Sequence, residues 1–163
     1  LMILISSISG FGFGWGKPVP VNPLRLRFGP RAGMALTAFA GPFSNILLAT
    51  LFGAPLRVLN IRSPVVYSLL FTVVSTNVAL AVFNLLPIHP LDGFSVLRGI
   101  VGTIPGRWAY NVSSWLDQML TWGPMIFMLL IVVDQVLPGA GIIWTVLGPF
   151  YRLLMGLILG TRG

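Results

Sequence analysis

Long apolar runs alternate along the chain with short stretches that hold most of the prolines and charges. Four of these runs, at residues 34–56, 65–86, 119–136 and 142–159, are long enough to cross a bilayer as helices, because a transmembrane helix needs about 20 apolar residues. The pattern therefore predicts an all-α fold, a polytopic transmembrane helix bundle of about four full spans.

Shorter elements lie before and between these runs. Residues 1–9 are apolar but too few to cross a bilayer, so we expect them to be the tail of a longer helix, a partial N-terminal span. Residues 10–33 are rich in Gly and Pro, which favours a re-entrant or interfacial loop. Residues 94–103 are predicted to form a short helix, and residues 104–116 a polar interfacial stretch that contains tryptophan.

All of these elements fit one membrane-embedded domain that covers residues 1–163. Its predicted parts are the helix tail 1–9, the loop 10–33, a core at 34–98 and a C-terminal part at 104–163 with the last two spans. Within the second span, Ser75, Thr76 and Asn77 are predicted to form hydrogen bonds between helices, as polar residues in lipid commonly do.

The composition agrees with a membrane protein and narrows its partners. Hydrophobic residues make up 56% of the chain and charged residues only 8%, against roughly 25% charged residues in soluble domains. The net charge of +7 comes from basic residues scattered singly through loops, which favours a bilayer with anionic headgroups over nucleic acid as the partner. The absence of cysteine excludes disulfides and thiolate metal ligands.

The basic residues also predict an orientation. Seven of them lie in the loops at 17–31 and 98–107 and in the tail after the last span, whereas only Arg57 and Arg62 lie in loops on the other side. Because cytoplasmic loops carry an excess of Lys and Arg, the 17–31 and 98–107 loops are predicted to be cytoplasmic. The membrane is expected to be the bacterial cytoplasmic membrane.

The chain offers few residues for acid, base or metal chemistry. It has one histidine, three aspartates and no glutamate. Asp92 follows a proline-containing break between apolar runs, and an ionisable residue inside a membrane costs at least about 2.5 kcal/mol, so it is a candidate functional residue. Two interpretations remain open: Asp92 could cap the helix that begins after Pro90, or it could belong to a site.

Three short sequences resemble motifs of one family. Residues 84–93 read Asn-Leu-Leu-Pro-Ile-His-Pro-Leu-Asp-Gly and resemble the N-x-x-P-x-x-P-L-D-G motif of the site-2 proteases, which are intramembrane zinc metalloproteases. Residues 14–23 resemble the loop before the second core helix in a bacterial branch of that family. Residues 40–45 resemble its A-G-P-x-x-N packing motif, so the resemblance covers about residues 11–98.

The resemblance implies a metal site, of which this sequence contains only one ligand. Asp92 matches the family's third zinc ligand, whereas the other two ligands and the general base belong to a His-Glu-x-x-His helix that this sequence does not contain. We expect that helix upstream in the intact protein, with Zn²⁺ as cofactor and a transmembrane peptide as substrate. The chain as written is not expected to be catalytic alone.

The resemblance also points to residues near the expected site. Its candidates for substrate contact or local packing are Asn84, Pro87, Pro90, Gly93, Gly41, Pro42 and Asn45. Asn84 could contact substrate or backbone near the metal, or could form a hydrogen bond between helices. His89 stands where the family often has proline, and it could be a metal ligand, a proton carrier or a polar loop residue. Phe94 departs from the small residue often found there.

A second functional class remains open beside the protease. A non-catalytic relative could serve as a structural or assembly subunit that contacts neighbouring membrane subunits in a larger complex. A small transporter or channel component explains Asp92 less specifically than the Pro-Leu-Asp-Gly context does. The zinc content of the intact protein distinguishes the first two classes.

Overall fold

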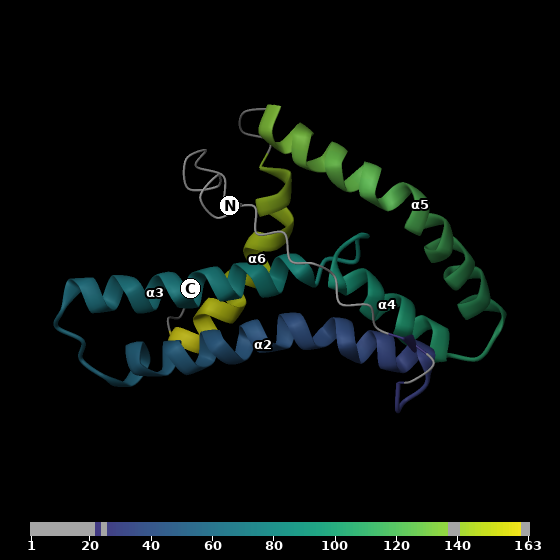
Figure 1. Cartoon of the computed structure of the whole chain (residues 1–163). Coiled ribbons are helices and arrows are strands. Elements are labelled where there is room, and N and C mark those ends of the chain that lie inside the picture. The colour runs from purple at the N-terminus through teal and green to yellow at the C-terminus, as the bar shows by residue number, and fades with distance from the viewer. Residues whose placement is uncertain (1–21, 24–25, 137–140, 161–163) are drawn as a thin grey trace, which may run out of the picture.

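The computed structural model describes residues 22–23, 26–136 and 141–160, which contain five helices and no strand. The helices are α2 (Pro30–Val58), α3 (Pro64–Asn84), α4 (Asp92–Thr103), α5 (Arg107–Val136) and α6 (Ile142–Leu159). Four of them, α2, α3, α5 and α6, are long and apolar enough to cross a membrane. The predicted all-α fold with four spans is therefore confirmed (Figure 1).

The predicted boundaries hold for most of the elements. The last span has the predicted bounds. Helices α2 and α4 begin a few residues earlier than predicted, and α3 ends two residues earlier than predicted. Residues 107–116 form the start of the long helix α5, and their location at the membrane interface stays a prediction. No helix-breaking residue separates them from the following span, so the helix continues. The predicted helix tail 1–9 and most of the loop 10–33 lie outside the described residues.

Helix α2 is the element on which the rest of the fold is arranged. Its second half packs against α3, which runs antiparallel to it, and its first half packs against α4, which continues in the direction of α3 (Figure 1). Close contacts of Gly53 with Val74 and of Gly99 with Ala35 define these two interfaces. The break between α3 and α4 consequently lies beside the middle of α2.

Small and β-branched residues form the core between α2, α3 and α6. Ala49, Val74 and Val78 are wholly buried there, and a Cβ on Gly53 would overlap Ile158 of α6. Such residues allow helices in lipid to approach closely, because close packing replaces the hydrophobic driving force that acts in water. Ser75 and Asn77 bond to carbonyls of their own helix, so they form none of the predicted hydrogen bonds to other helices within the described part of the chain.

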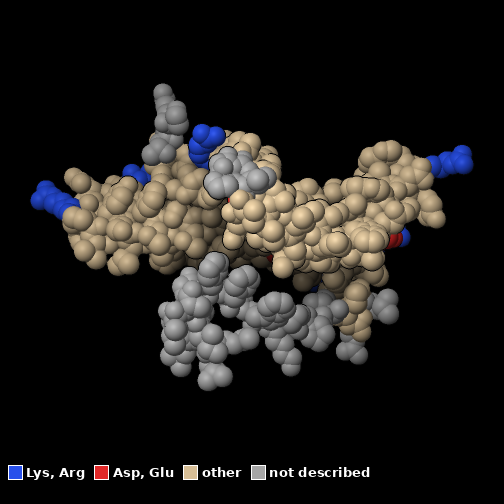
Figure 2. Space-filling view, turned by 90° about the horizontal axis from the view of Figure 1, so that it is seen from above, with Lys and Arg blue, Asp and Glu red and all other residues tan. Residues whose placement is uncertain are grey.

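Helix α5 is held at a second, smaller core. Phe94 and Val101 of α4 pack there with Ala109 and Leu116 of α5. Most other apolar side chains of α5 are exposed. Charged side chains lie mostly towards the two ends of the elongated molecule, and the surface between them is largely uncharged apart from basic side chains such as the exposed Arg152 of α6 (Figure 2). An apolar surface of this extent fits lipid, and together with the four candidate spans it identifies an integral membrane protein.

Side chains from other helices satisfy both ends of α6. Asp134 of α5 accepts a hydrogen bond from the backbone N–H of Ile143, 3.2 Å away. Arg57 of α2 donates to the carbonyl of Leu157 at 3.0 Å. Helix ends leave backbone groups without intrahelical partners, so these two contacts fix where α6 begins and ends.

The last span does not end where strict alternation of the spans would place it. Its first residues lie near Phe83, at the end of α3 next to the break, and it ends beside Arg57 at the far end of α2. Alternation places that end on the side of the 17–31 loop instead. The difference arises because the second half of α5 lies beside the break, where Phe127 contacts the ring of Phe83, so that α6 starts from there.

Candidate functional site

The aspartate loop, residues 85–92, connects α3 to α4. Pro87 and Pro90 prevent a continuous helix here, since proline lacks the N–H that a helix interior requires. The peptide bond between His89 and Pro90 is cis. The backbone N–H of Leu91 donates to the carbonyl of Ile88 at 2.8 Å, which closes the loop into a turn before α4 begins.

Asp92 is the first residue of α4, and its carboxylate does not cap that helix. Leu91 occupies the capping position, and no side-chain capping bond is formed. No group in the described part of the chain donates a hydrogen bond to the Asp92 carboxylate. The capping interpretation is therefore wrong.

Helix α2 contacts this carboxylate at its Ala-Gly-Pro sequence. A Cβ placed on Gly41 would lie 3.1 Å from Oδ2 of Asp92. Pro42 is buried beside it, and Asn45 is half-buried one turn further along α2. Two of the motifs recognised separately in the sequence thus meet in space, with the glycine leaving room next to the carboxylate.

Gly93 fixes the position of Asp92 against the preceding helix. A Cβ at Gly93 would overlap the carbonyl of Leu85 and lie 2.6 Å from the carbonyl oxygen of Leu86. Only glycine allows the start of α4 to approach the end of α3 this closely. Asn84 is the last residue of α3 and is half-buried. Its predicted contact with substrate or backbone near a metal stays a prediction.

The donor set of this chain fits one ligand of a zinc ion. Asp92 offers a carboxylate, which is a suitable zinc ligand, and the described residues give it no competing partner. No three His, Cys, Asp or Glu side chains lie together in the described part of the chain. A zinc site built on Asp92 therefore needs ligands beyond these residues.

His89 packs on the other side of the loop. Its ring meets that of Phe94 edge to face, with the ring centroids 5.3 Å apart. Gly123 of α5 lies against its backbone, since a Cβ there would be 2.7 Å from Cβ of His89. Phe94 itself is only 2% exposed, so its departure from the family's small residue has a packing reason. A role of His89 in metal binding or proton transfer stays a prediction.

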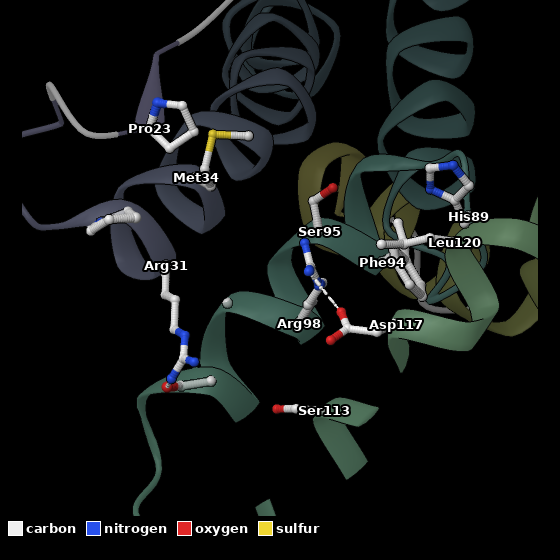
Figure 3. Close-up of a pocket in the computed structure, with 13 residues that line it drawn as sticks. Pro23, Arg31, Met34, His89, Phe94, Ser95, Arg98, Ser113, Asp117 and Leu120 are labelled. Atoms are coloured by element: carbon white, nitrogen blue, oxygen red, sulfur yellow. Dashed lines mark hydrogen bonds and ion pairs between the residues drawn. The ribbon is translucent and has the colours of Figure 1, made fainter. Parts of the chain in front are cut away.

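A cavity of about 360 Å³ lies between α2, α4 and α5, beside His89. Arg98 of α4 and Asp117 of α5 form an ion pair in its wall, 2.6 Å from Nη2 to Oδ1 (Figure 3). Arg31 of α2 donates to the carbonyl of Gly102 at 2.7 Å. No sequence motif contains Asp117, and only the tertiary structure brings it to Arg98.

The comparisons with known proteins agree with these motifs. The sequence model of Peptidase family M50 matches residues 52–130, which include the aspartate loop and α4. No solved structure gives a significant match.

Two bacterial relatives cover different shares of the chain. The protein named "Putative zinc metalloprotease YwhC" of Bacillus subtilis (strain 168) is 31% identical over 144 residues, which are 83% of this chain and 61% of that protein. "Putative zinc metalloprotease Rip3" of Mycobacterium tuberculosis (strain ATCC 25618 / H37Rv) is 38% identical over 71 residues, 42% of this chain and 18% of the relative. This chain thus spans about three fifths of the first relative. With its Asn84 to Gly93 motif and its spanning helices, the chain belongs to peptidase family M50, the site-2 protease family.

Proposed function

We propose that this chain forms the aspartate-containing part of an intramembrane zinc metalloprotease. Asp92 is one of three protein ligands of a catalytic zinc, and the other two are histidines of a His-Glu-x-x-His sequence elsewhere in the whole protein, whose glutamate is the general base. The substrate is a transmembrane peptide. The enzyme resides in the bacterial cytoplasmic membrane, with the 17–31 and 98–107 loops on the cytoplasmic side.

The observation that carries this proposal is the state of the Asp92 carboxylate. It lies at a helix break between spans, it accepts no hydrogen bond from the described residues, and Gly41 leaves space beside it. An ionised carboxylate in such a place is costly unless a cation compensates it. Both relatives carry the name "Putative zinc metalloprotease", which supports zinc as that cation.

The residues of this chain have positioning and binding roles in the proposal. Bound zinc acts as a Lewis acid that activates water for peptide hydrolysis. Asp92 supplies an oxygen ligand, Gly93 holds that ligand against the end of α3, and Gly41 keeps the adjoining space open. Asn84 and Asn45 are polar side chains that can hydrogen-bond an unwound substrate.

The hydrogen bond of Arg31 with the Gly102 carbonyl supports the orientation. It joins the start of α2 to the end of α4, so that the 17–31 and 98–107 loops are expected at the same membrane surface. An excess of basic residues at one surface favours the cytoplasmic side.

Replacement of Asp92 by asparagine in the full-length protein tests the proposal. Asp92→Asn keeps the shape of the side chain but removes its charge. We expect the zinc affinity to fall by more than about 100-fold, since even outer-shell changes cost about 10–100-fold. Zinc content by mass spectrometry and cleavage of a membrane substrate are the measurements.

His89→Ala is the matched variant on the same loop. If His89 is a packing residue, this variant keeps its zinc, whereas zinc loss in both variants would make His89 a ligand as well. Full zinc content and undiminished cleavage in Asp92→Asn would overturn the proposal. A wild-type protein that binds no zinc would instead indicate a non-catalytic relative that serves as an assembly subunit.

A further inference from the structure

The cavity beside the aspartate loop is lined by charged residues that have no role in the proposed zinc site. Two guanidinium groups, of Arg31 and Arg98, and one carboxylate, of Asp117, lie in its wall. Ser95 and Ser113 add hydroxyl groups. In Figure 3 these side chains come from α2, α4 and α5 and surround the same open space. The two guanidinium groups and the carboxylate together give the cavity wall a single net positive charge.

The arginines have donors left for a ligand. Arg31 uses Nη1 for the carbonyl of Gly102, and Arg98 directs Nε and Nη2 to one oxygen of Asp117. A guanidinium group has five N–H donors in total, so each arginine can still bind an anion in the cavity. Arginine suits phosphate in particular because its planar fork matches two phosphate oxygens.

The position of the cavity in the fold indicates that it lies at the membrane interface, at the depth of the lipid headgroups. Arg31 lies one residue after the start of the spanning helix α2, and Asp117 lies in the first half of α5. Trp108 and Tyr110, at the start of α5, are both exposed. Exposed aromatic residues near helix ends are typical of the membrane interface, where basic pockets between spans bind lipid headgroups.

The space is large enough for a phosphate ester. The cavity of about 360 Å³ shares Arg31, Gly102, Ser113 and Asp117 with a second cavity of about 350 Å³. Pockets for small ligands begin at about 300 Å³. The second cavity extends the first towards Tyr110 and Gly106 at the start of α5, which leaves room for the glycerol of a lipid.

From this geometry we infer that the cavity between α2, α4 and α5 binds a phosphate group with one negative charge. Arg31 and Arg98 hold the phosphate oxygens, and Ser95 and Ser113 contribute hydroxyl hydrogen bonds. The same chemistry belongs to an anionic phospholipid headgroup and to free phosphate. The site is separate from Asp92 and does not depend on the proposed protease activity.

Two probes distinguish the sources of the phosphate. The full-length protein is placed in nanodiscs of phosphatidylcholine, and either inorganic phosphate or phosphatidylglycerol is titrated into it. A saturable rise of the thermal unfolding midpoint is expected with at least one probe. A response to phosphatidylglycerol identifies a lipid site, and a response to inorganic phosphate alone identifies a site for the free anion. No response to either probe overturns the inference.

Variants locate the binding to this cavity. Arg31→Gln removes one charged donor and should weaken binding of the responding probe by about tenfold or more. Arg31→Lys should retain part of the affinity. Arg62→Gln, at an exposed arginine after the far end of α2, is the matched control and should bind like wild type. Equal losses in Arg31→Gln and Arg62→Gln would contradict the assignment.

A substitution at Asp117 is expected to strengthen binding of the probe, whereas Arg31→Gln weakens it. Asp117→Asn removes the one negative charge from the cavity wall, so binding should become tighter by a few-fold or more. If Asp117 acted only by holding Arg98 in place, the same change would weaken binding instead. Because the ion pair is half exposed to solvent, its loss should leave the fold intact.

Discussion

Single glycines decide how closely the functional residues of this protein can approach one another. Gly41 of α2 faces the Asp92 carboxylate, and Gly93 rests on the carbonyls that end α3. Both positions belong to motifs that resemble the family's, but the motifs do not reveal that one glycine serves the other motif's carboxylate. The close approach explains why a glycine precedes the proline in the middle of a spanning helix, where either residue alone weakens the helix.

Gly41→Ala should impair the metal site without disturbing the fold. The added methyl group would lie 3.1 Å from Oδ2 of Asp92, which forces the carboxylate to move by a few tenths of an ångström. We expect about a 10–100-fold loss of zinc affinity in the full-length protein, as for other changes that displace a ligand. Zinc titration by competition with a chelator measures the loss.

Gly148→Ala provides the control for this prediction. It is also a glycine inside a spanning helix, but its added methyl group would meet only the end of the Arg152 side chain, 3.9 Å away. Zinc affinity in this variant should equal that of wild type. Equal zinc affinity in Gly41→Ala and wild type would mean that Gly41 does not limit the carboxylate.

At the scale of the elements, the fold depends on the seam between α2 and α4. Helix α4 is too short to span a bilayer, yet it carries Asp92 at its first residue and packs along the first half of α2. Its contacts with α2 are made by Gly99 and Gly102, whereas Gly93 packs against the end of α3 and Phe94 lies on the α5 side. The seam therefore sets the position of the carboxylate relative to Gly41.

The two glycines at the end of α4 should differ in their tolerance of alanine. In Gly99→Ala the methyl group would overlap Ala35 and lie 2.9 Å from the backbone oxygen of Arg31, so the helices must separate. In Gly102→Ala it would meet Cδ of the flexible Arg31 side chain, which can move. We expect Gly99→Ala to cost about 1–3 kcal/mol of stability and Gly102→Ala clearly less. Unfolding in mild detergent compares them, and equal losses would show that the seam is looser than described.

At the scale of the whole molecule, the exposed surface is as informative as the core. The cores are small, and many large apolar side chains are exposed. In water such a surface would lead to aggregation, whereas in lipid it costs nothing. The charged side chains at the two ends of the molecule agree with membrane surfaces on either side (Figure 2).

Lysine substitutions on α2 test this surface directly. Leu47 is 54% exposed near the middle of the helix, and Val58 is 78% exposed at its end. If α2 crosses the bilayer, Leu47→Lys should reduce insertion by about 2.5–3.5 kcal/mol, and Val58→Lys should be tolerated beside the membrane surface. The fraction of full-length protein recovered in membranes is the measurement. Equal recovery of both variants would contradict a spanning α2.

Apolar run length and motif order together determined much of this protein from the sequence alone. The runs identified the four spans and the all-α class because a bilayer requires apolar helices of a minimum length. The Pro-Leu-Asp-Gly string indicated the family by its resemblance to a known motif, and the cost of an ionisable residue inside a membrane marked Asp92 as a candidate functional residue.

Only the tertiary structure decided how those parts come together. It brought Gly41 to Asp92, joined Arg98 to Asp117, used Asp134 and Arg57 to satisfy the ends of α6, and merged residues 107–116 into α5. These contacts join residues far apart in the chain. Sequence periodicity describes one helix at a time, whereas the pairing of helices depends on which small residues meet across the seams between them.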